Sequence, residues 1–309
     1  MSLLRSLLIK GSESAALARL VRDRAFARRA VRRFMPGETL DAALDAAAGQ
    51  AALGIATTLT YLGEQVTDAA HTEAVARHYV EALERVRARA LPCEFSLKLT
   101  HLGLDLGRDV CVGMLERICT KAAATGAFVW IDMEGTPHTD RTLEVFRTVR
   151  ARHANLGLCV QAYLRRTAAD VEALIPLGAA LRIVKGAYRE PPALVHRRKK
   201  EVAEAFFRLG ARLLEPDARR AGVRAVFGTH DVPLLARLGA HARGLGLPRD
   251  AFECHMLYGI RTADQRRLAA QGVPVRVLIS YGESWFAWYM RRLAERPANL
   301  WFVVRSVFA

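Results

Sequence analysis

Charged, amide, hydroxyl and imidazole side chains stand at or near the ends of the short apolar runs that recur along this sequence. They are Lys98, Asp132, Glu134, Gln161, Arg182, Lys185, Thr229, His230, Asp231, Glu253 and His255. A single polar residue after a strand is most often a solvated loop residue, but recurrence after nearly every run is harder to explain in that way. Because the carboxyl ends of parallel strands meet on one side of a barrel, these residues predict a polar pocket there.

Four of these residues, Asp132, Glu134, His230 and His255, have the side chains of metal ligands. They lie on separate runs, and no HxH or HExxH spacing brings any two of them together. We therefore predict no metal site, and a metal-dependent barrel lyase or hydrolase is retained as an alternative.

Lys98 and Lys185 raise a second alternative, a Schiff-base lysine, because barrels also support aldolase chemistry. Neither lysine has a distinguishing local context in the sequence. This alternative therefore depends on residue type alone.

Residues 281–299, YGESWFAWYMRRLAERPAN, predict a helix that follows a strand. Trp288, Arg292 and Glu295 are spaced i, i+4 and i+7 and so share one face of that helix. The adjacent guanidinium groups of Arg291 and Arg292 suit a small carboxylate, which they would bind by charge-assisted hydrogen bonds. A solvated basic helix face with local Arg–Glu pairs explains the same residues equally well.

The elements that must position these residues alternate between short β-branched or apolar runs and longer amphipathic runs. Strands are predicted at 54–59, 94–99, 128–133, 158–162, 181–185, 224–228, 252–256 and 275–279. Helices are predicted between them at 72–90, 109–125, 139–152, 168–175, 199–212, 232–243 and 262–270. The alternation predicts an α/β fold, a (βα)8 TIM-type barrel over residues 51–309 with N-terminal helices over residues 1–50. Neither GxGxxG nor GxxxxGK[ST] follows a predicted strand, so neither a Rossmann nor a P-loop nucleotide site is predicted.

The composition is that of a globular protein with an unusual charge. The chain has 309 residues, of which 51% are hydrophobic and 25% charged, and its formal net charge is +15. Such a charge favours an anionic partner, which could be nucleic acid, an acidic membrane surface or an acidic protein. The basic residues are spread over the whole chain without an RNA-binding signature, so we predict no nucleic-acid partner. A basic binding or regulatory protein is the non-enzymatic alternative.

The cysteines and the apolar segments bear on localisation. The five cysteines are far apart and form no CxxC pair, which disfavours zinc sites and disulfide frameworks and fits a reducing compartment. No run approaches the length of a membrane span, and the N-terminus does not resemble a signal peptide. We therefore expect a cytoplasmic protein. A helix is predicted at 15–34, and its basic cluster at 22–33 suggests peripheral contact with the inner membrane face, although a solvated helix face explains the cluster too.

Several segments, taken in order, resemble the proline dehydrogenase family. They are LGE (62–64), SLKLT (96–100), WIDME (130–134), VQAY (160–163), LRIVKGAY (181–188), GTHD (228–231), ECHMLYG (253–259) and the helix at 281–299. The matches extend over about residues 54–305, and LRIVKGAY is the most specific internal one. So many matches in order do not easily arise by chance. The resemblance implies a distorted (βα)8 barrel that binds FAD.

The resemblance also implies roles for the matched residues. It implies catalytic roles for Asp132 and for Arg182, which would approach flavin N5. It implies substrate contacts for Lys98, Leu257, Arg291 and Arg292, and a gating role for Glu64 through a pair with Arg292. The implied cofactor contacts are Met133, Gln161, Arg182, Val184, Lys185, Gly186, Ala187, Thr229, His230, His255 and Glu295.

The activity that the resemblance implies is oxidation of L-proline to 1-pyrroline-5-carboxylate, the first step of proline catabolism. Hydride would move from ring carbon 5 to flavin N5, and the electrons would then pass to a membrane quinone. In such chemistry the protein supplies orientation and electrostatics.

Three residues depart from the family's pattern in the expected substrate pocket. Thr60 stands where the family usually has Asp, and Leu278 and Trp288 stand where it usually has Tyr. The loss of polar partners in a pocket changes discrimination between related substrates. Proline is the first expectation, and hydroxyproline or another cyclic or N-alkyl amino acid is the alternative.

Overall fold

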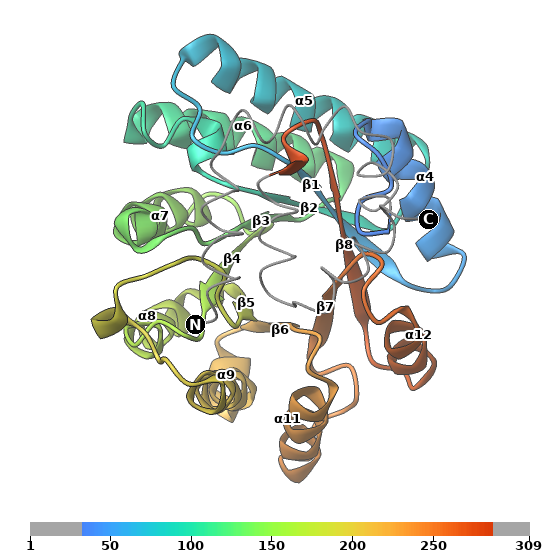
Figure 1. The fold of residues 1–309 in the computed structure, drawn as a ribbon, viewed down its shortest axis with the longest axis vertical. Helices are drawn as coiled ribbons and strands as arrows, with labels where there is room; N and C mark the ends of the chain where they lie inside the picture. The colour runs from blue at the N-terminus through green and yellow to red at the C-terminus, as the bar shows by residue number, and fades with distance from the viewer. Residues whose placement is uncertain (1–32, 287–309) are drawn as a thin grey trace, which may run out of the picture.

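The computed structural model describes residues 33–286 and shows a closed barrel of eight parallel strands in sequence order (Figure 1). The strands are β1 (Ala56–Tyr61), β2 (Cys93–Leu97), β3 (Val129–Ile131), β4 (Leu156–Gln161), β5 (Ala180–Val184), β6 (Arg224–Gly228), β7 (Glu253–Leu257) and β8 (Val275–Tyr281). Pairing of β8 with β1 closes the barrel. The prediction of a (βα)8 barrel is confirmed, and each predicted strand boundary lies within two residues of the observed one.

Helices surround the barrel and bury its outer face. They are α4 (Leu40–Ala51), α5 (Ala69–Ala88), α6 (Arg108–Thr125), α7 (Thr136–Arg150), α8 (Thr167–Leu174), α9 (Lys199–Leu214), α10 (Pro216–Arg220), α11 (Val232–Gly244) and α12 (Thr262–Ala270). The sequence analysis missed α10, a single short helix that begins at Pro216, a residue suited to the first helical position. Short 3-10 turns occur at Thr100–Leu102, Ile175–Leu177 and Pro192–Leu194.

The N-terminal part of the described chain packs directly on the barrel. Helix α4 begins after Thr39, whose side chain accepts a hydrogen bond from the backbone N–H of Ala42 as an N-cap. Its apolar face buries Leu40 and Leu44 against β1 and β8 (Figure 1). Residues 1–32 lie outside the described residues, so the division into parts 1–50 and 51–309 stays a prediction.

Strand alternation decides which side chains reach the barrel interior. Phe95 and Leu97 of β2 belong to the core between strands and helices, so Glu94 and Ser96 face inward. On β8, Val277 and Ile279 belong to the same outer core, so Arg276, Leu278 and Ser280 face inward. The barrel interior is therefore polar at many positions, and its charges must be paired.

The N-terminal end of the interior holds four charged residues that we call the barrel floor, namely Glu94, Arg224, Glu253 and Arg276. Arg224 bonds to Glu94 at 2.7 Å and to Glu253 at 2.5 Å, and Arg276 lies 3.2 Å from Glu94 and 3.6 Å from Glu253. Burial would raise the pKa of Glu253, but hydrogen bonds from His255 and Arg224 outweigh burial and lower it. Each carboxylate of the floor thus has two arginine partners.

Removal of one floor arginine should destabilise the fold strongly. We expect Arg224→Leu to lower the free energy of unfolding by about 3 kcal/mol, because it leaves two partly buried carboxylates with Arg276 alone. Denaturant unfolding measures the loss. Arg117→Ala is the matched control: Arg117 pairs with Glu73 at 2.6 Å, but both side chains are about 40% exposed, and such pairs contribute about 1 kcal/mol or less. Equal losses in the two variants would contradict the prediction.

Candidate active site

Arg182 is the central cation of the candidate site, and its side chain is only 3% exposed inside the barrel. Its Nη2 donates to Ser96 Oγ at 2.8 Å and forms an ion pair with Asp132. Ser96 Oγ donates in turn to Asp132 Oδ1 at 3.0 Å. The three side chains come from β5, from β2 and from the residue that follows β3, so the barrel itself brings them together. Because an unpaired buried charge is costly, Asp132 stabilises Arg182 in its charged form.

Trp130 of β3 supports the same cation. Arg182 Cζ lies 4.9 Å from the centroid of the Trp130 ring, a cation–π distance. Trp130 Nε1 donates to Glu94 of the barrel floor at 2.6 Å, which fixes the orientation of the indole. Burial would lower the pKa of Arg182, but the Asp132 carboxylate outweighs burial, and the pKa is raised. A rigid, charged guanidinium of this kind can stabilise negative charge that develops during a reaction.

Lys98 and Glu134 lie at the barrel mouth, just after β2 and β3. Lys98 Nζ lies 2.9 Å from Glu64 Oε1. Glu134 accepts hydrogen bonds from the backbone N–H and the hydroxyl of Thr100 at 3.1 and 2.7 Å, and its own backbone carbonyl accepts from Gln161 Nε2 at 2.9 Å. Burial raises the pKa of Glu134, against the opposing effects of Lys98 and the Thr100 hydrogen bonds. Lys98 is therefore held as one member of an ion pair, which disfavours it as a Schiff-base nucleophile.

Lys185 and Asp231 form a second ion pair on the mouth, between the ends of β5 and β6. Their Nζ and Oδ2 atoms are 2.6 Å apart. Asp231 also caps α11 by accepting from the backbone N–H of Leu234 at 3.2 Å, and its own N–H donates to Thr229 Oγ1 at 3.2 Å. Burial would raise the pKa of Asp231, but the Lys185 hydrogen bond outweighs burial and lowers it. Because these backbone hydrogen bonds hold Asp231 in place, its ion pair also holds Lys185 at the mouth.

Gly186 follows Lys185 in a conformation that requires glycine. Its φ is +114°, and a Cβ placed there would lie 2.1 Å from the Tyr163 ring. The backbone N–H of Tyr163 donates to the carbonyl of Lys185 at 3.0 Å, which binds the two loops together. The chain after β5 therefore keeps its path across the mouth only with glycine at this position.

Two histidines also belong to this region: His255 lies on β7, and His230 follows β6. His255 of β7 is 4% exposed, its Nε2 lies 3.5 Å from Glu253 Oε2, and its ring contacts Trp130 edge-on. Burial, together with the positive charge of Arg182, lowers the pKa of His255 to about 4. His230 Nε2 accepts the backbone N–H of Leu257 at 3.3 Å. His255 is therefore a neutral imidazole at neutral pH.

The remaining predicted residues divide into those that reach the mouth and those that the structure does not describe. Met133, Val184, Ala187, Thr229 and Leu257 end or follow β3, β5, β6 and β7. Arg291, Arg292, Glu295 and Trp288 lie outside the described residues. The carboxylate seat and the pairing of Glu64 with Arg292 therefore stay predictions, and among residues 33–286 Glu64 pairs with Lys98.

Two contributors to the site were not predicted from the sequence, and one residue was misplaced. No role was predicted for Ser96 or Trp130, although both lie on the inward face of their strands and two residues before Lys98 and Asp132. That alternation was the available signal. The predicted placement of Glu253 at a C-terminal strand end was wrong, because Glu253 is the first residue of β7 and belongs to the barrel floor.

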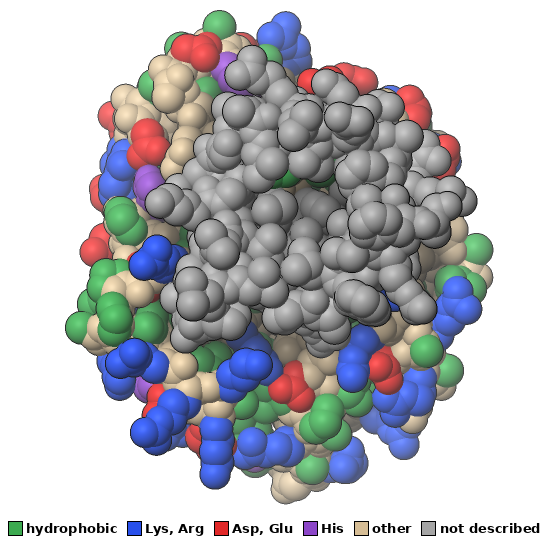
Figure 2. Space-filling model, viewed as in Figure 1, with side chains coloured by type: hydrophobic (Ala, Val, Ile, Leu, Met, Phe, Trp, Pro, Cys, Tyr) green, Lys and Arg blue, Asp and Glu red, His purple; other side chains and the backbone are tan. Residues whose placement is uncertain are grey.

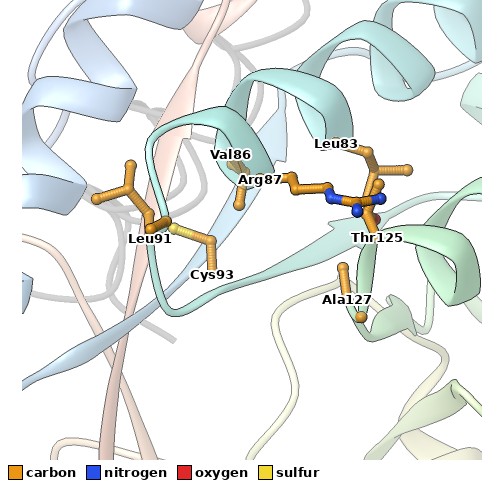
Figure 3. Close-up of a pocket in the computed structure, with 9 residues that line it drawn as sticks. Leu83, Val86, Arg87, Leu91, Cys93, Thr125 and Ala127 are labelled. Carbon is orange, nitrogen blue, oxygen red and sulfur yellow. The ribbon is translucent and has the colours of Figure 1, made fainter.

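A pocket of about 230 Å³ lies near the N-terminal ends of β2 and β3, at the end of the barrel away from the mouth, and Figure 3 shows its lining. It is lined by Leu83, Val86, Arg87, Ala90, Leu91, Cys93, Thr125, Gly126 and Ala127, from the ends of α5 and α6 and the starts of β2 and β3. None of the predicted site residues contributes to it. Within residues 33–286 no group of three or more His, Cys, Asp or Glu side chains is placed to hold a metal ion.

The closed barrel, with its charged residues gathered at the carboxyl ends of the strands, defines the protein as a (βα)8-barrel enzyme. The proline dehydrogenase family model matches residues 43–305. Proline dehydrogenase 1 of Bacillus subtilis strain 168 is 35% identical over 276 residues, covering 89% of this chain and 90% of that protein. Proline dehydrogenase of Deinococcus radiodurans is also 35% identical, over 280 residues and 89% of each chain. The chain belongs to the proline dehydrogenase family.

Solved structures agree on the fold. Proline utilization A from Bdellovibrio bacteriovorus, inactivated by N-propargylglycine, superposes with a TM-score of 0.81 at 22% identity. The match covers 94% of this chain and 36% of that one. Proline utilization A from Bradyrhizobium japonicum, mutant D778Y, gives a TM-score of 0.75 at 24% identity, over 91% and 32% of the two chains. This chain thus spans about a third of the length of those proteins.

A side chain at Gly186 should disrupt the mouth. We expect Gly186→Ala to lower the free energy of unfolding by about 1–3 kcal/mol, because alanine must adopt φ +114° and displace the Tyr163 ring. Gly244→Ala, at the end of α11, is the control: a Cβ there has no atom within 4 Å and no positive φ. Thermal unfolding of both variants provides the comparison. A Gly186→Ala protein as stable as Gly244→Ala would show that the loop adapts without cost.

The buried His255 should make stability fall in acid. Its pKa is about 4 in the folded protein and about 6.5 in the unfolded chain. As the pH falls below about 6.5, the unfolded chain binds the proton first, so stability is lost down to about pH 4. We expect His255→Phe to reduce the loss between pH 7 and pH 4 by on the order of 3 kcal/mol. Denaturant unfolding at the two pH values measures it, and an unchanged difference would show that His255 is not the group responsible.

Proposed function

We propose that this protein is an FAD-dependent proline dehydrogenase that oxidises L-proline to 1-pyrroline-5-carboxylate, the first step of proline catabolism. The observation that supports it most is the buried Arg182–Asp132 pair beneath Lys98, in a chain of this family. The site has a fixed cation inside the barrel, a lysine and carboxylates at the mouth, and no cluster of metal ligands among the described residues.

The residues of the mouth fit a flavin. Among residues 33–286, Arg182 Nη1 is buried and has no hydrogen-bond partner, so the site offers a cationic donor to a ligand. Such a donor suits a ring system that becomes electron-rich on reduction. Bound FAD would supply the hydride acceptor, N5. Arg182 would stabilise the added negative charge, and Asp132 would hold Arg182 in position.

The other cofactor contacts would come from the residues around the mouth. Lys185, Gly186 and Ala187 would follow one side of the cofactor, and Thr229 and His230 the next strand. Gln161, Met133, Val184, His255 and Glu295 complete the set that we propose.

For the substrate, the proposed oxidation removes a hydride from ring carbon 5 and a proton from the ring nitrogen, which leaves a carbon–nitrogen double bond. The amine must be neutral before hydride can leave. The neighbouring cations Lys98 and Arg182 disfavour a protonated amine. Arg291 and Arg292 would bind the substrate carboxylate, Leu257 would form an apolar wall, and Glu64 would move between Lys98 and Arg292 as a gate.

A quinone at a membrane surface is the electron acceptor that we propose, with peripheral contact by a cytoplasmic protein. Lys and Arg side chains gather over α9, α11 and α12 (Figure 2), and the exposed run Arg197-Arg198-Lys199-Lys200 leads into α9. Such a surface is attracted to anionic lipid.

Among residues 33–286, no helix has both the length and the hydropathy of a membrane span. The five cysteines are free and buried, which suits a reducing compartment.

The visible spectrum of the purified protein tests the proposal. We expect a flavin spectrum that L-proline bleaches under anaerobic conditions, because hydride transfer reduces the flavin. In Asp132→Asn the flavin should remain, and bleaching should slow by roughly 100-fold because Arg182 loses its charged partner. Asp105→Asn, at the surface pair with Arg141, is the control and should bleach at the normal rate. A protein that cannot be loaded with FAD would refute the proposed function.

A further inference from the structure

Glu64 lies in the segment 62–67, which connects β1 to α5 without a helix or strand of its own. The backbone N–H groups of Gln65 and Val66 donate to Thr100, to its hydroxyl at 3.2 Å and to its carbonyl at 3.1 Å. Thr100 begins the 3-10 turn that comes directly after Lys98 and Leu99. The residues of this turn therefore help to set how Glu64 meets Lys98, whose Nζ lies 2.9 Å from Glu64 Oε1.

His101 is the residue of this turn against which the backbone of Gly63 packs. The His101 side chain is buried, and a Cβ placed at Gly63 would lie only 2.1 Å from its Nε2 and 2.3 Å from its Cε1. Gly63 does not have a positive φ. Glycine is therefore required at this position by the imidazole beside it rather than by the backbone conformation.

Two aromatic neighbours fix the orientation of the His101 ring. Tyr61 of β1 stacks on it at a centroid distance of 5.5 Å and an angle of 27°, and His71 of α5 meets it edge-on at 6.1 Å. Burial, together with the positive charge of Lys98, lowers the pKa of His101 to about 3. The ring is neutral at neutral pH, so it does not compete with Lys98 for the Glu64 carboxylate.

We propose that His101 is a positioning residue whose imidazole forms the seat for Gly63 and thereby holds the Glu64 carboxylate against Lys98 at the barrel mouth. This inference rests on the proposed function, in which Lys98 contacts the substrate and Glu64 gates the site. His101 acts through Glu64 and not on the reacting atoms. Its loss should therefore speed release of the substrate and leave the hydride step unchanged.

Anaerobic single-turnover reduction of the flavin by L-proline separates these two effects. We expect His101→Ala to raise the apparent Kd for L-proline by roughly tenfold, with the limiting reduction rate within about twofold of wild type. Glu64→Gln should also raise the Kd. In the Glu64→Gln background, His101→Ala should add less than about twofold, because both changes remove the same contact. Effects that multiply, or a Glu64→Gln protein with normal binding, would overturn the proposal.

A second pair of variants tests the contact itself. We expect Gly63→Ala to raise the Kd for L-proline by roughly tenfold in the wild-type background, because the added methyl group displaces the segment from the ring. In the His101→Ala background the methyl group has room, so the same change should add less than about twofold. An equal effect of Gly63→Ala in both backgrounds would show that the imidazole is not the seat.

Leu102→Ala is the matched control. Leu102 is the next residue of the same turn and is fully buried, but its side chain belongs to the hydrophobic core. We expect it to lower the melting temperature at least as much as His101→Ala does, because it leaves a cavity, and to leave the Kd for L-proline unchanged. If Leu102→Ala weakens substrate binding as much as His101→Ala, the stability of the turn is responsible and the proposal fails.

Hydrogen exchange measures the seat without substrate or flavin reduction. The backbone N–H groups of Leu62, Gln65 and Val66 are hydrogen-bonded, and we expect His101→Ala to speed their exchange by roughly tenfold. Unchanged exchange would refute the seat even where L-proline bleaches the flavin. A wild-type flavin that L-proline does not bleach would refute the proposed function, and exchange would then still decide whether His101 seats Gly63.

Discussion

The structure depends on the need to keep a guanidinium charged inside a barrel. Arg182 is almost fully buried, and an unpaired charge at that depth would not be tolerated. This requirement explains two neighbouring residues. Asp132, which follows β3, pairs with Arg182, and Ser96 on β2 hydrogen-bonds to both Arg182 and Asp132. Three strands must therefore keep their mutual register for the site to exist. The closed barrel provides that rigidity, because no strand has a free edge along which it could slip.

Trp130 links this cation to the opposite end of the barrel. Its ring lies 4.9 Å from Arg182 Cζ and 5.3 Å from Arg224 Cζ, and its Nε1 donates to Glu94. The indole thus lies between the buried guanidinium group of Arg182 and the partly buried one of Arg224 and contacts both. A shift of the barrel floor would be transmitted to Arg182 through this one rigid ring. The floor and the site are consequently one electrostatic unit, although only the mouth faces a substrate.

Part of this arrangement could be predicted from the sequence, because some constraints act locally. The alternation of apolar runs with amphipathic helices predicted the strand boundaries, because a strand that is buried on both faces needs a continuous apolar run. Lys98 and Asp132 were predicted near the ends of such runs, and in the structure they directly follow β2 and β3 at the mouth. Ser96 and Trp130 were not recognised, because their importance comes from partners on other strands. Glu253 was misplaced for a related reason: a charge at the start of a strand and a charge at its end look alike in sequence. The pairing of Lys98 with Glu64 depends on how the loop after β1 folds back, which no periodicity reports.

The two ends of the barrel differ in how their charged groups are paired, and this difference bears on where a ligand can bind. In the barrel floor, both carboxylates contact two arginines each, so an added ligand would have to displace a protein partner. Toward the mouth, Arg182 Nη1 and Ser280 Oγ are buried without hydrogen-bond partners in the part of the chain that the structure describes. A ligand that reaches these two atoms replaces no existing hydrogen bond and so keeps the full benefit of the contacts it makes. Unpaired donors retained in a rigid wall are a form of preorganisation: their desolvation cost is met when the protein folds rather than when the substrate binds. A ligand at this end would therefore gain most from groups that match these two positions, one cationic on β5 and one neutral on β8.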